Sequence, residues 1–404
     1  MTTPLDLDAV RREFPALASG FVYLDNAGGS QTLGRVADRV RDYLLTTNVQ
    51  LGASYAVSQA STARVHEAAR ATAEYIGARD ASEVVLGASS TQLLHNLALA
   101  MECTLTPGDE IIVTNADHHA NIGAWRRLAK RGVVLKTWKL DETSWRLEER
   151  DLLTLLTKRT KLVAFTHATN LLGTIHDVPR LTRIVHEHGA RVCVDGVAFA
   201  PHRAIDVAAW DVDYYVFSFY KVYGPHIGML YGKREALEAL DTINHEFITS
   251  VPYKLQPGNV SFELSHGLGG LFEYVDSLGG KDAAFAAFAA HEEELAERLL
   301  AWLREQPGVR IHGEHSGDRL LRVPTISFSV DGLAPEAIVR AVDPHGIGIR
   351  HGDFYARSLV EALGLSERGG VVRVSMVHYT TTDEVDRVIA ALGEAVRSCI
   401  RGLP

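Results

Sequence analysis

Short apolar runs alternate with amphipathic stretches through the middle of the chain, from about residue 83 to residue 233. The runs lie at 83–89, 110–117, 133–138, 161–170, 190–197, 213–221 and 228–233. Between most of them, apolar residues recur at helical spacing, as in "LTRIVHEHGA" (181–190), where Gly189 suits a helix C-cap. Apolar runs without alternation, joined by helices, predict an α/β fold: a mostly parallel seven-stranded sheet covered on both faces.

The pattern changes after "SFELSHGLGGLFEYVDSL" (261–278), which predicts a long connecting helix. Strand-like runs then mix with helical stretches, and this mixture predicts a smaller α+β domain. The runs lie at 309–314, 324–330, 346–352 and 371–379, and the helical stretches at 334–342 and 382–400. We therefore expect an N-terminal segment (1–20) that packs on the small domain, a large domain (21–265) and a small C-terminal domain (266–404).

Composition narrows the class of protein. The 404 residues are 46% hydrophobic and 23% charged, which are ordinary globular values that argue against disorder. A formal charge of −9 argues against a nucleic-acid coat or an anionic membrane surface. The most apolar stretch, 283–303, carries charges at helical spacing, so no membrane span is expected.

The cysteines indicate neither a disulfide framework nor a structural zinc site. Cys103, Cys193 and Cys399 lie far apart, and none forms a C-x-x-C pair. The acidic N-terminus lacks the basic start and apolar core of a signal peptide. A cytoplasmic location is therefore the expectation.

Polar residues follow several of the predicted strands, and in parallel sheets ligands bind at these carboxyl ends. Ser90, Thr91 and Gln92 stand at a strand-to-helix turn, where free N–H groups can hold an anion; a plain N-cap is the alternative. His118 follows the next strand with a second histidine, but no third metal ligand stands at a sensible spacing. Asn170 ends another strand, where an Asx turn is the alternative.

Asp195 and Lys221 follow two further apolar runs. A buried carboxylate needs a partner, although an aspartate before a glycine also suits a simple turn. Lys221 comes about one βαβ unit later, so the two side chains can meet at one edge of the sheet. Its ammonium at the end of an apolar strand leaves three interpretations: a surface lysine, an anion binder or a catalytic amine.

One known cofactor requires this combination of groups. Pyridoxal phosphate needs a lysine for its Schiff base, a carboxylate for its pyridine nitrogen and an anion site for its phosphate. The glycine fingerprints of nicotinamide and P-loop enzymes do not occur in the sequence. The pieces therefore indicate a pyridoxal-phosphate site.

The chain resembles the class V aminotransferase family of fold-type I pyridoxal-phosphate enzymes, in its cysteine desulfurase and selenocysteine lyase branch. The resemblance runs through "YLDNAGGSQ" (23–31), "DHHANIGAW" (117–125), "THATNLLGTI" (166–175), "VDGVAFAPH" (194–202), "FSFYKVYGPHIGMLYG" (217–232), "IRHGDFYARSL" (349–359) and "VRVSMVHYTTTDEVD" (372–386). It implies a large domain with the sheet and a smaller C-terminal domain. It also implies a homodimer with the active site at the interface and an amino acid as the substrate.

The resemblance also implies a role for each candidate residue. Lys221 would form the Schiff base, Asp195 would pair with the pyridine nitrogen, and His118 would stack on the ring. Asn170 would touch the phenolic oxygen or the substrate. The implied phosphate ligands are Thr91, Gln92, Ser218 and Tyr220, with Asn259 reaching the neighbour's phosphate, and Ser90 of the anion turn joins them as a candidate cofactor-binding residue. Arg373 would bind the substrate carboxylate, with Arg350 nearby and Tyr355 in a loop that shapes the substrate pocket.

That loop departs from the family pattern, because desulfurases carry a reactive cysteine there. Here it reads "RHGDFYARSL" (350–359), with Tyr355 near the expected position. A persulfide needs a thiolate. We therefore expect C–S β-lyase chemistry on a cysteine-derived amino acid without an enzyme persulfide. Transamination, epimerisation and decarboxylating deamination on the same scaffold are alternatives, and a non-catalytic protein of this fold is a more distant one.

Overall fold

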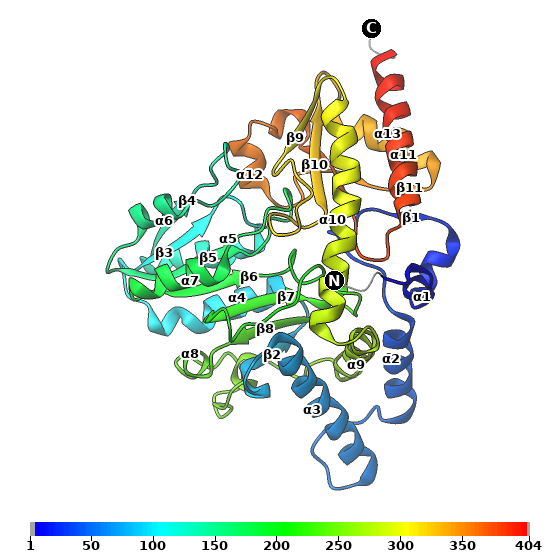
Figure 1. Cartoon of the computed structure of the whole chain (residues 1–404). Coiled ribbons are helices and arrows are strands. Elements are labelled where there is room, and N and C mark those ends of the chain that lie inside the picture. Colours follow the sequence, from blue (N-terminus) through cyan, green and yellow to red (C-terminus); the bar gives the residue numbers. More distant parts are fainter. Residues whose placement is uncertain (1–4, 402–404) are drawn as a thin grey trace.

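The computed structural model describes residues 5–401; residues 1–4 and 402–404, at the ends of the two predicted terminal domains, lie outside it. A central sheet has the strand order β2-β8-β7-β6-β5-β3-β4 (Figure 1). Its strands are β2 (Val84–Gly87), β3 (Glu110–Thr114), β4 (Val134–Trp138), β5 (Thr160–Thr166), β6 (Arg191–Asp195), β7 (Tyr214–Ser218) and β8 (Gly228–Gly232). Only β8 runs antiparallel to its neighbours in this sheet. The predicted seven-stranded, mostly parallel sheet is confirmed.

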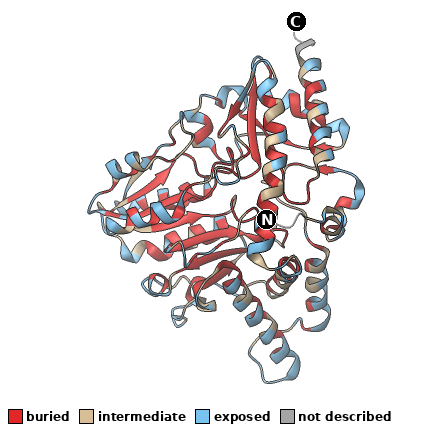
Figure 2. Cartoon of the chain, viewed as in Figure 1, coloured by how far each residue is buried: buried red, intermediate tan, exposed pale blue. Residues whose placement is uncertain are grey.

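Helices cover both faces of this sheet because successive strand residues point into two different apolar clusters. Val192 and Val194 of β6 lie in one cluster and Cys193 in the other. Residues of α4 (Ser90–Met101) and α5 (Ala120–Arg126) join the Cys193 cluster. Residues of α3 (Ala56–Ile76), α6 (Glu149–Leu155) and α7 (Val178–Glu187) join the Val194 cluster. Buried strands therefore lie between outer helices that are exposed on one side (Figure 2).

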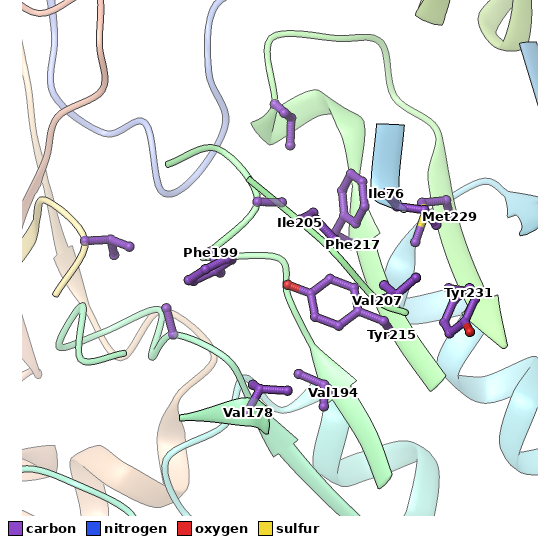
Figure 3. Packing of buried hydrophobic residues seen from close by; sticks show 14 of the residues in the cluster. Ile76, Val178, Val194, Phe199, Ile205, Val207, Tyr215, Phe217, Met229 and Tyr231 are labelled. Carbon is purple, nitrogen blue, oxygen red and sulfur yellow. The ribbon is translucent and has the colours of Figure 1, made fainter. Parts of the chain in front are cut away.

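The Val194 cluster is rich in aromatic residues beneath the strand ends. Figure 3 shows Phe199, Tyr215 and Phe217 in the same cluster as Val194. All four side chains are buried. Large buried rings contribute much of the apolar area that stabilises a core.

A second sheet has four antiparallel strands in the order β12-β13-β10-β9. They are β9 (Val309–His312), β10 (Thr325–Val330), β12 (Arg350–Gly352) and β13 (Val371–Ser375). The long helix α10 (Lys281–Glu305) runs from the first sheet to this one (Figure 1), and α11 (Pro335–Val342) and α13 (Thr382–Arg401) complete its cluster. This arrangement matches the α+β pattern predicted for the C-terminal part.

The run predicted as one strand at 346–352 forms two strands in different sheets. β11 (Ile347–Gly348) pairs in parallel with β1 (Val22–Tyr23), whereas β12 pairs with β13. Residues near the N-terminus therefore join the C-terminal part of the fold. The proposed division into 1–20, 21–265 and 266–404 stays a prediction.

The N-terminal helix α1 (Leu7–Arg12) also contacts the C-terminal part, since Arg11 Nη1 donates to the Tyr379 carbonyl at 2.7 Å. The remaining helices are α2 (Gly34–Thr46), α8 (Arg234–Glu238), α9 (Phe262–Ser277) and α12 (Arg357–Ala362). The predicted connecting helix at 261–278 corresponds to α9. Within residues 5–401, no helix is long and apolar enough to cross a membrane.

Candidate active site

Lys221 lies in η5 (Phe219–Lys221), a single 3₁₀ turn directly after β7. The side chain is 8% exposed, and within the described chain its Nζ has no hydrogen bond or ion pair. Burial lowers the pKa of Lys221 to about 8, and the charge of Arg373 acts in the same direction. Lys254 is also buried, but its Nζ donates to the carbonyls of Glu238 and Leu240 at 2.9 and 2.6 Å. Lys254 is thus a satisfied structural lysine, whereas Lys221 has a free amine at a strand end.

Asp195 is the last residue of β6, beside β7, and its side chain is 4% exposed. Its Oδ1 accepts a hydrogen bond from the Val197 N–H at 2.9 Å, which is the Asp-Gly turn left open by the sequence. Burial raises the pKa of the Asp195 carboxyl to about 6, while the Val197 N–H and the charge of Lys221 lower it. Electrostatic coupling of Asp195 and Lys221 agrees with their expected placement at one edge of the sheet.

A second buried carboxyl, Asp117, lies near Asp195, and it was not assigned a role from the sequence. It accepts hydrogen bonds from Thr114 Oγ1 and from Asn121 Nδ2, the latter at 2.7 Å, and Asn121 in turn accepts from Trp125. Burial raises the pKa of Asp117 to about 8, and the neighbouring charge of Asp195 raises it further. The raised pKa favours the protonated form of Asp117 near neutral pH. Asp117, like Asp195, stands at the end of a short apolar run, so the same sequence pattern points to both residues.

His118 is held as a neutral ring at the start of α5. Its Nδ1 accepts the Ala120 N–H at 3.1 Å, which leaves the proton on Nε2. Burial lowers the pKa of His118 to about 4, with contributions from Lys221 and Arg373. The Tyr355 ring lies 5.3 Å from the His118 ring, centroid to centroid. Among the described residues, no group of three or more His, Cys, Asp and Glu side chains could hold a metal ion.

Arg373 of β13 is 2% exposed and is surrounded by contacts from three segments. Its Nη2 donates to Asp25 Oδ1 at 2.8 Å and its Nη1 to the Asn170 carbonyl at 3.1 Å. The Phe354 ring covers the guanidinium, with 3.8 Å between Cζ and the ring centroid. Arg350 is more exposed and lies 3.6 Å from the other oxygen of Asp25. Asp25 and Phe354 were not assigned from sequence, although both stand inside motifs that carried the resemblance.

The loop that carries Tyr355 is fastened to the site by its backbone. Phe354 and Tyr355 have φ values of 52° and 59°, which are unusual for residues other than glycine. The Phe354 carbonyl accepts from Asn170 Nδ2 at 2.8 Å, and the Tyr355 carbonyl accepts from the His119 N–H at 2.7 Å. These two bonds hold the loop against the end of β5 and the start of α5, with the Tyr355 side chain 70% exposed.

Two buried polar atoms beside this loop have no hydrogen-bond partner within the described residues. One is Oδ1 of Asn170, the residue whose Nδ2 holds the loop, and the other is Nε of Arg373. The two residues are themselves in contact through the Asn170 carbonyl. Unpartnered buried polar atoms are unusual in a folded protein, so this pair indicates a place for a polar ligand.

The predicted anion turn at the start of α4 is partly an N-cap and partly a cluster of hydroxyl groups. Ser89 Oγ accepts the Gln92 N–H at 3.2 Å, which is the N-cap alternative. Ser218, at the end of β7, accepts the Ser90 N–H at 2.9 Å and contacts Ser90 Oγ at 3.1 Å. The turn lies close to Gly228, where an added Cβ would stand 2.6 Å from the Ser89 carbonyl carbon. The structure thus brings Ser90 and Ser218 together, with Thr91 exposed on the first turn of α4.

Two predicted phosphate ligands have other neighbours. The Tyr220 ring stacks on His226, with 4.9 Å between centroids and nearly parallel planes. Asn259 Nδ2 donates to Gln50 Oε1 at 3.3 Å, and Asn259 lines a cavity of about 380 Å³ together with Gln92 and His226. Their roles toward a phosphate stay predictions.

The residues present fit pyridoxal phosphate. The site contains a free buried amine, a carboxylate that interacts with it electrostatically, a neutral histidine and a helix start lined by hydroxyl groups. The unpartnered atoms of Asn170 and Arg373 belong to the same site. The α4 N-terminus favours an anion through its helix dipole. Lys221, His118 and Asp195 would hold the ring, and the hydroxyl groups of Ser90 and Ser218 would face its phosphate.

None of the three cysteines stands in the Tyr355 loop. Cys193 is buried within β6, where burial raises the pKa of its thiol. Cys103 is exposed just beyond α4, and Cys399 lies in α13. A thiolate nucleophile is therefore absent from the position that the sequence analysis singled out.

Comparisons with known proteins give a consistent result. The family model described as "Aminotransferase class-V" matches residues 22–388. An aminotransferase-like protein of Gibberella zeae is 44% identical over 97% of this chain and 98% of its own length. A probable cysteine desulfurase of Halobacterium salinarum is 34% identical, with 97% of each chain covered. A crystal structure of a cysteine desulfurase from Escherichia coli superposes with a TM-score of 0.86 at 29% identity, covering 98% of this chain and 100% of the other.

Proposed function

The chain belongs to the class V aminotransferase family of pyridoxal-phosphate-dependent enzymes, and we propose that it cleaves the Cβ–S bond of a cysteine-derived amino acid by β-elimination. The main support for this proposal is the loop at the site, which presents Tyr355 where a persulfide-forming enzyme needs a thiol. The proposal combines the desulfurase-like scaffold with this missing nucleophile. Sulfur then leaves as a thiol and does not pass to an enzyme cysteine.

Each side chain at the site has a task that follows from its surroundings. When bound, pyridoxal phosphate supplies an electron sink for the charge that develops at the substrate Cα. Lys221 would anchor the cofactor and would then take the Cα proton, and burial favours its neutral, proton-accepting amine by lowering the pKa of Lys221. The Asp195 carboxylate would pair with the pyridine nitrogen of the cofactor and favour its protonated form.

We assign binding of the substrate carboxylate to the part of the site around Arg373. Arg373 is the group with the geometry for a bidentate bond to the α-carboxylate. Asn170, whose Oδ1 has no partner among the described residues, can accept a hydrogen bond from the substrate amine or from a cofactor group. The overall reaction balances as conjugate plus water giving thiol, pyruvate and ammonia.

The test is product analysis with purified, cofactor-loaded protein. We expect S-substituted L-cysteines to give pyruvate, ammonia and thiol in equal amounts, with no added sulfur on any cysteine of the protein by mass spectrometry. The Lys221→Ala variant is the control for non-enzymatic breakdown. A keto acid of unchanged carbon skeleton would indicate transamination, an aldehyde decarboxylating deamination, and a D-amino acid epimerisation; each of these outcomes without pyruvate contradicts the lyase proposal.

Cofactor capture by the apoprotein should depend on pH through Lys221. Because the neutral amine is the nucleophile, we expect the capture rate to rise about tenfold per pH unit below pH 8 and to level off above it. Stopped-flow absorbance in the visible band of the cofactor measures this rate. A rate that still rises steeply above about pH 9 would show that the Lys221 pKa is not lowered from its ordinary value.

The homodimer and the cytoplasmic location implied earlier stay predictions. Sedimentation of the loaded protein would determine the number of subunits.

A further inference from the structure

A carboxylate of the protein itself already occupies the arginine that we assign to the substrate. Asp25 lies between two guanidinium groups, 2.8 Å from Arg373 Nη2 and 3.6 Å from Arg350 Nη1. The Arg373 side chain is 3% exposed and that of Arg350 is 59% exposed. One carboxylate therefore joins a buried cation to one that faces solvent.

Arg373 uses only part of its hydrogen-bonding capacity at the edge that would bind a carboxylate, since Nη2 has a partner and Nε has none among the described residues. A bidentate pair needs two neighbouring N–H groups of the guanidinium, and each available pair includes Nη2. Nη2 donates to Asp25, Nη1 donates to the Asn170 carbonyl, and Nε is buried without a partner in the described chain. Nη2 carries two N–H groups, and Asp25 accepts from one of them. A ligand carboxylate at the Nε–Nη2 edge must therefore share Nη2 with the Asp25 carboxylate, so that two anions compete for one buried guanidinium.

Gly28 provides the space in which the Asp25 carboxylate lies. An added Cβ at Gly28 would stand 2.8 Å from Asp25 Oδ2 and 3.2 Å from its Cγ. The nearest atom is the end of a flexible side chain, and Gly28 does not have the positive φ that would strain an alanine. Beside it, a cavity of about 390 Å³ is lined by Tyr23, Asp25, Gly28 and Arg350, among others. Asp25 has room to turn away from Arg373 toward Arg350.

We propose that Asp25 is a positioning residue that holds Arg373 until a substrate carboxylate displaces it, and that Asp25 then pairs with Arg350. This inference rests on the proposed function, because it takes Arg373 as the carboxylate site. It means that ligands bind against a resident competitor. If the released form of Arg373 makes up about a tenth of the free protein, the observed Kd is about tenfold above the intrinsic one.

The experiment measures the Kd of propionate, a carboxylate without an amine, by calorimetry on the loaded protein. Asp25→Asn removes the competing charge at nearly constant shape, and Gly28→Ala keeps the charge but pushes it away from its place. We expect both variants to bind propionate about tenfold more tightly than the original protein. Arg350→Gln should have the opposite effect and weaken binding, because the displaced Asp25 then lacks its second partner.

Gly29→Ala is the matched control on the same turn. Its added Cβ would meet only the Tyr220 ring, at an ordinary 3.4 Å, so the Kd should not change. Arg373→Gln separates the two proposals. If it leaves propionate binding intact, Arg373 is not the carboxylate site and the proposed function loses that assignment. If it abolishes binding while Asp25→Asn or Gly28→Ala binds propionate equally or more weakly, Asp25 is a purely structural partner and the inference is overturned.

Discussion

Replacing Lys221 with alanine should lower kcat by about 10³-fold or more, because in the proposed mechanism this residue both anchors the cofactor and moves the Cα proton. Within residues 5–401, Lys254 is the only other buried lysine, and its ammonium is already hydrogen-bonded. The measurement is turnover of the best S-substituted cysteine, together with borohydride reduction and peptide mapping. The original protein should carry the reduced adduct on Lys221, and the variant should carry none.

Lys254→Ala is the control for loss of a buried lysine. The Lys254 ammonium bonds two backbone carbonyls away from the candidate cofactor contacts, so its loss should cost about 1–3 kcal/mol of unfolding free energy. The adduct on Lys221 should persist in this variant. An adduct on Lys254, or full activity of Lys221→Ala, would remove Lys221 from the mechanism.

Replacing Asp195 with asparagine should lower kcat by about 10²- to 10³-fold while cofactor content stays near that of the original protein. Asparagine keeps an acceptor for the Val197 N–H, but its neutral amide does not stabilise a protonated pyridine nitrogen. Steady-state kinetics and visible absorbance of the purified variant measure the two quantities.

Asp117→Asn is the matched control, since it makes the same change at a neighbouring buried carboxyl. Burial raises the pKa of Asp117 to about 8, which favours the neutral carboxyl near pH 7, so the substitution changes the charge of the site little. We expect kcat to fall by less than about threefold, in line with a small positional effect. Equal losses in the two variants would mean that the Asp195 charge has no special role.

The strands and their carboxyl-end residues were predictable because local pattern and chain direction are enough to place them. Seven apolar runs became the seven strands of the central sheet, and Asp195 and Lys221 came together because neighbouring parallel strands end at one edge. The run at 346–352 was less predictable. Its two halves pair with β1 and β13. A short apolar run does not indicate which distant segment it will pair with.

The residues around Arg373 show why part of the site escaped prediction. Asp25 is 348 residues away from Arg373 along the chain, and Phe354 covers the same guanidinium from a third segment. Neither contact has a periodicity or a spacing in the sequence. The protonation of Asp117 is similar, because its raised pKa comes from burial among side chains of several elements.

The order of residues alone predicts the α/β architecture, the lysine and carboxylate suited to the cofactor, and a site loop with a tyrosine and no cysteine. These features depend on local hydrophobic periodicity, on chemical type and on position within motifs. Three-dimensional contacts decide which buried lysine is hydrogen-bonded and which has a free amine. They also decide which carboxyl is charged and which carboxylate already contacts Arg373. Burial and hydrogen bonding set the pKa and the partners of each group, and both arise only when distant segments pack together.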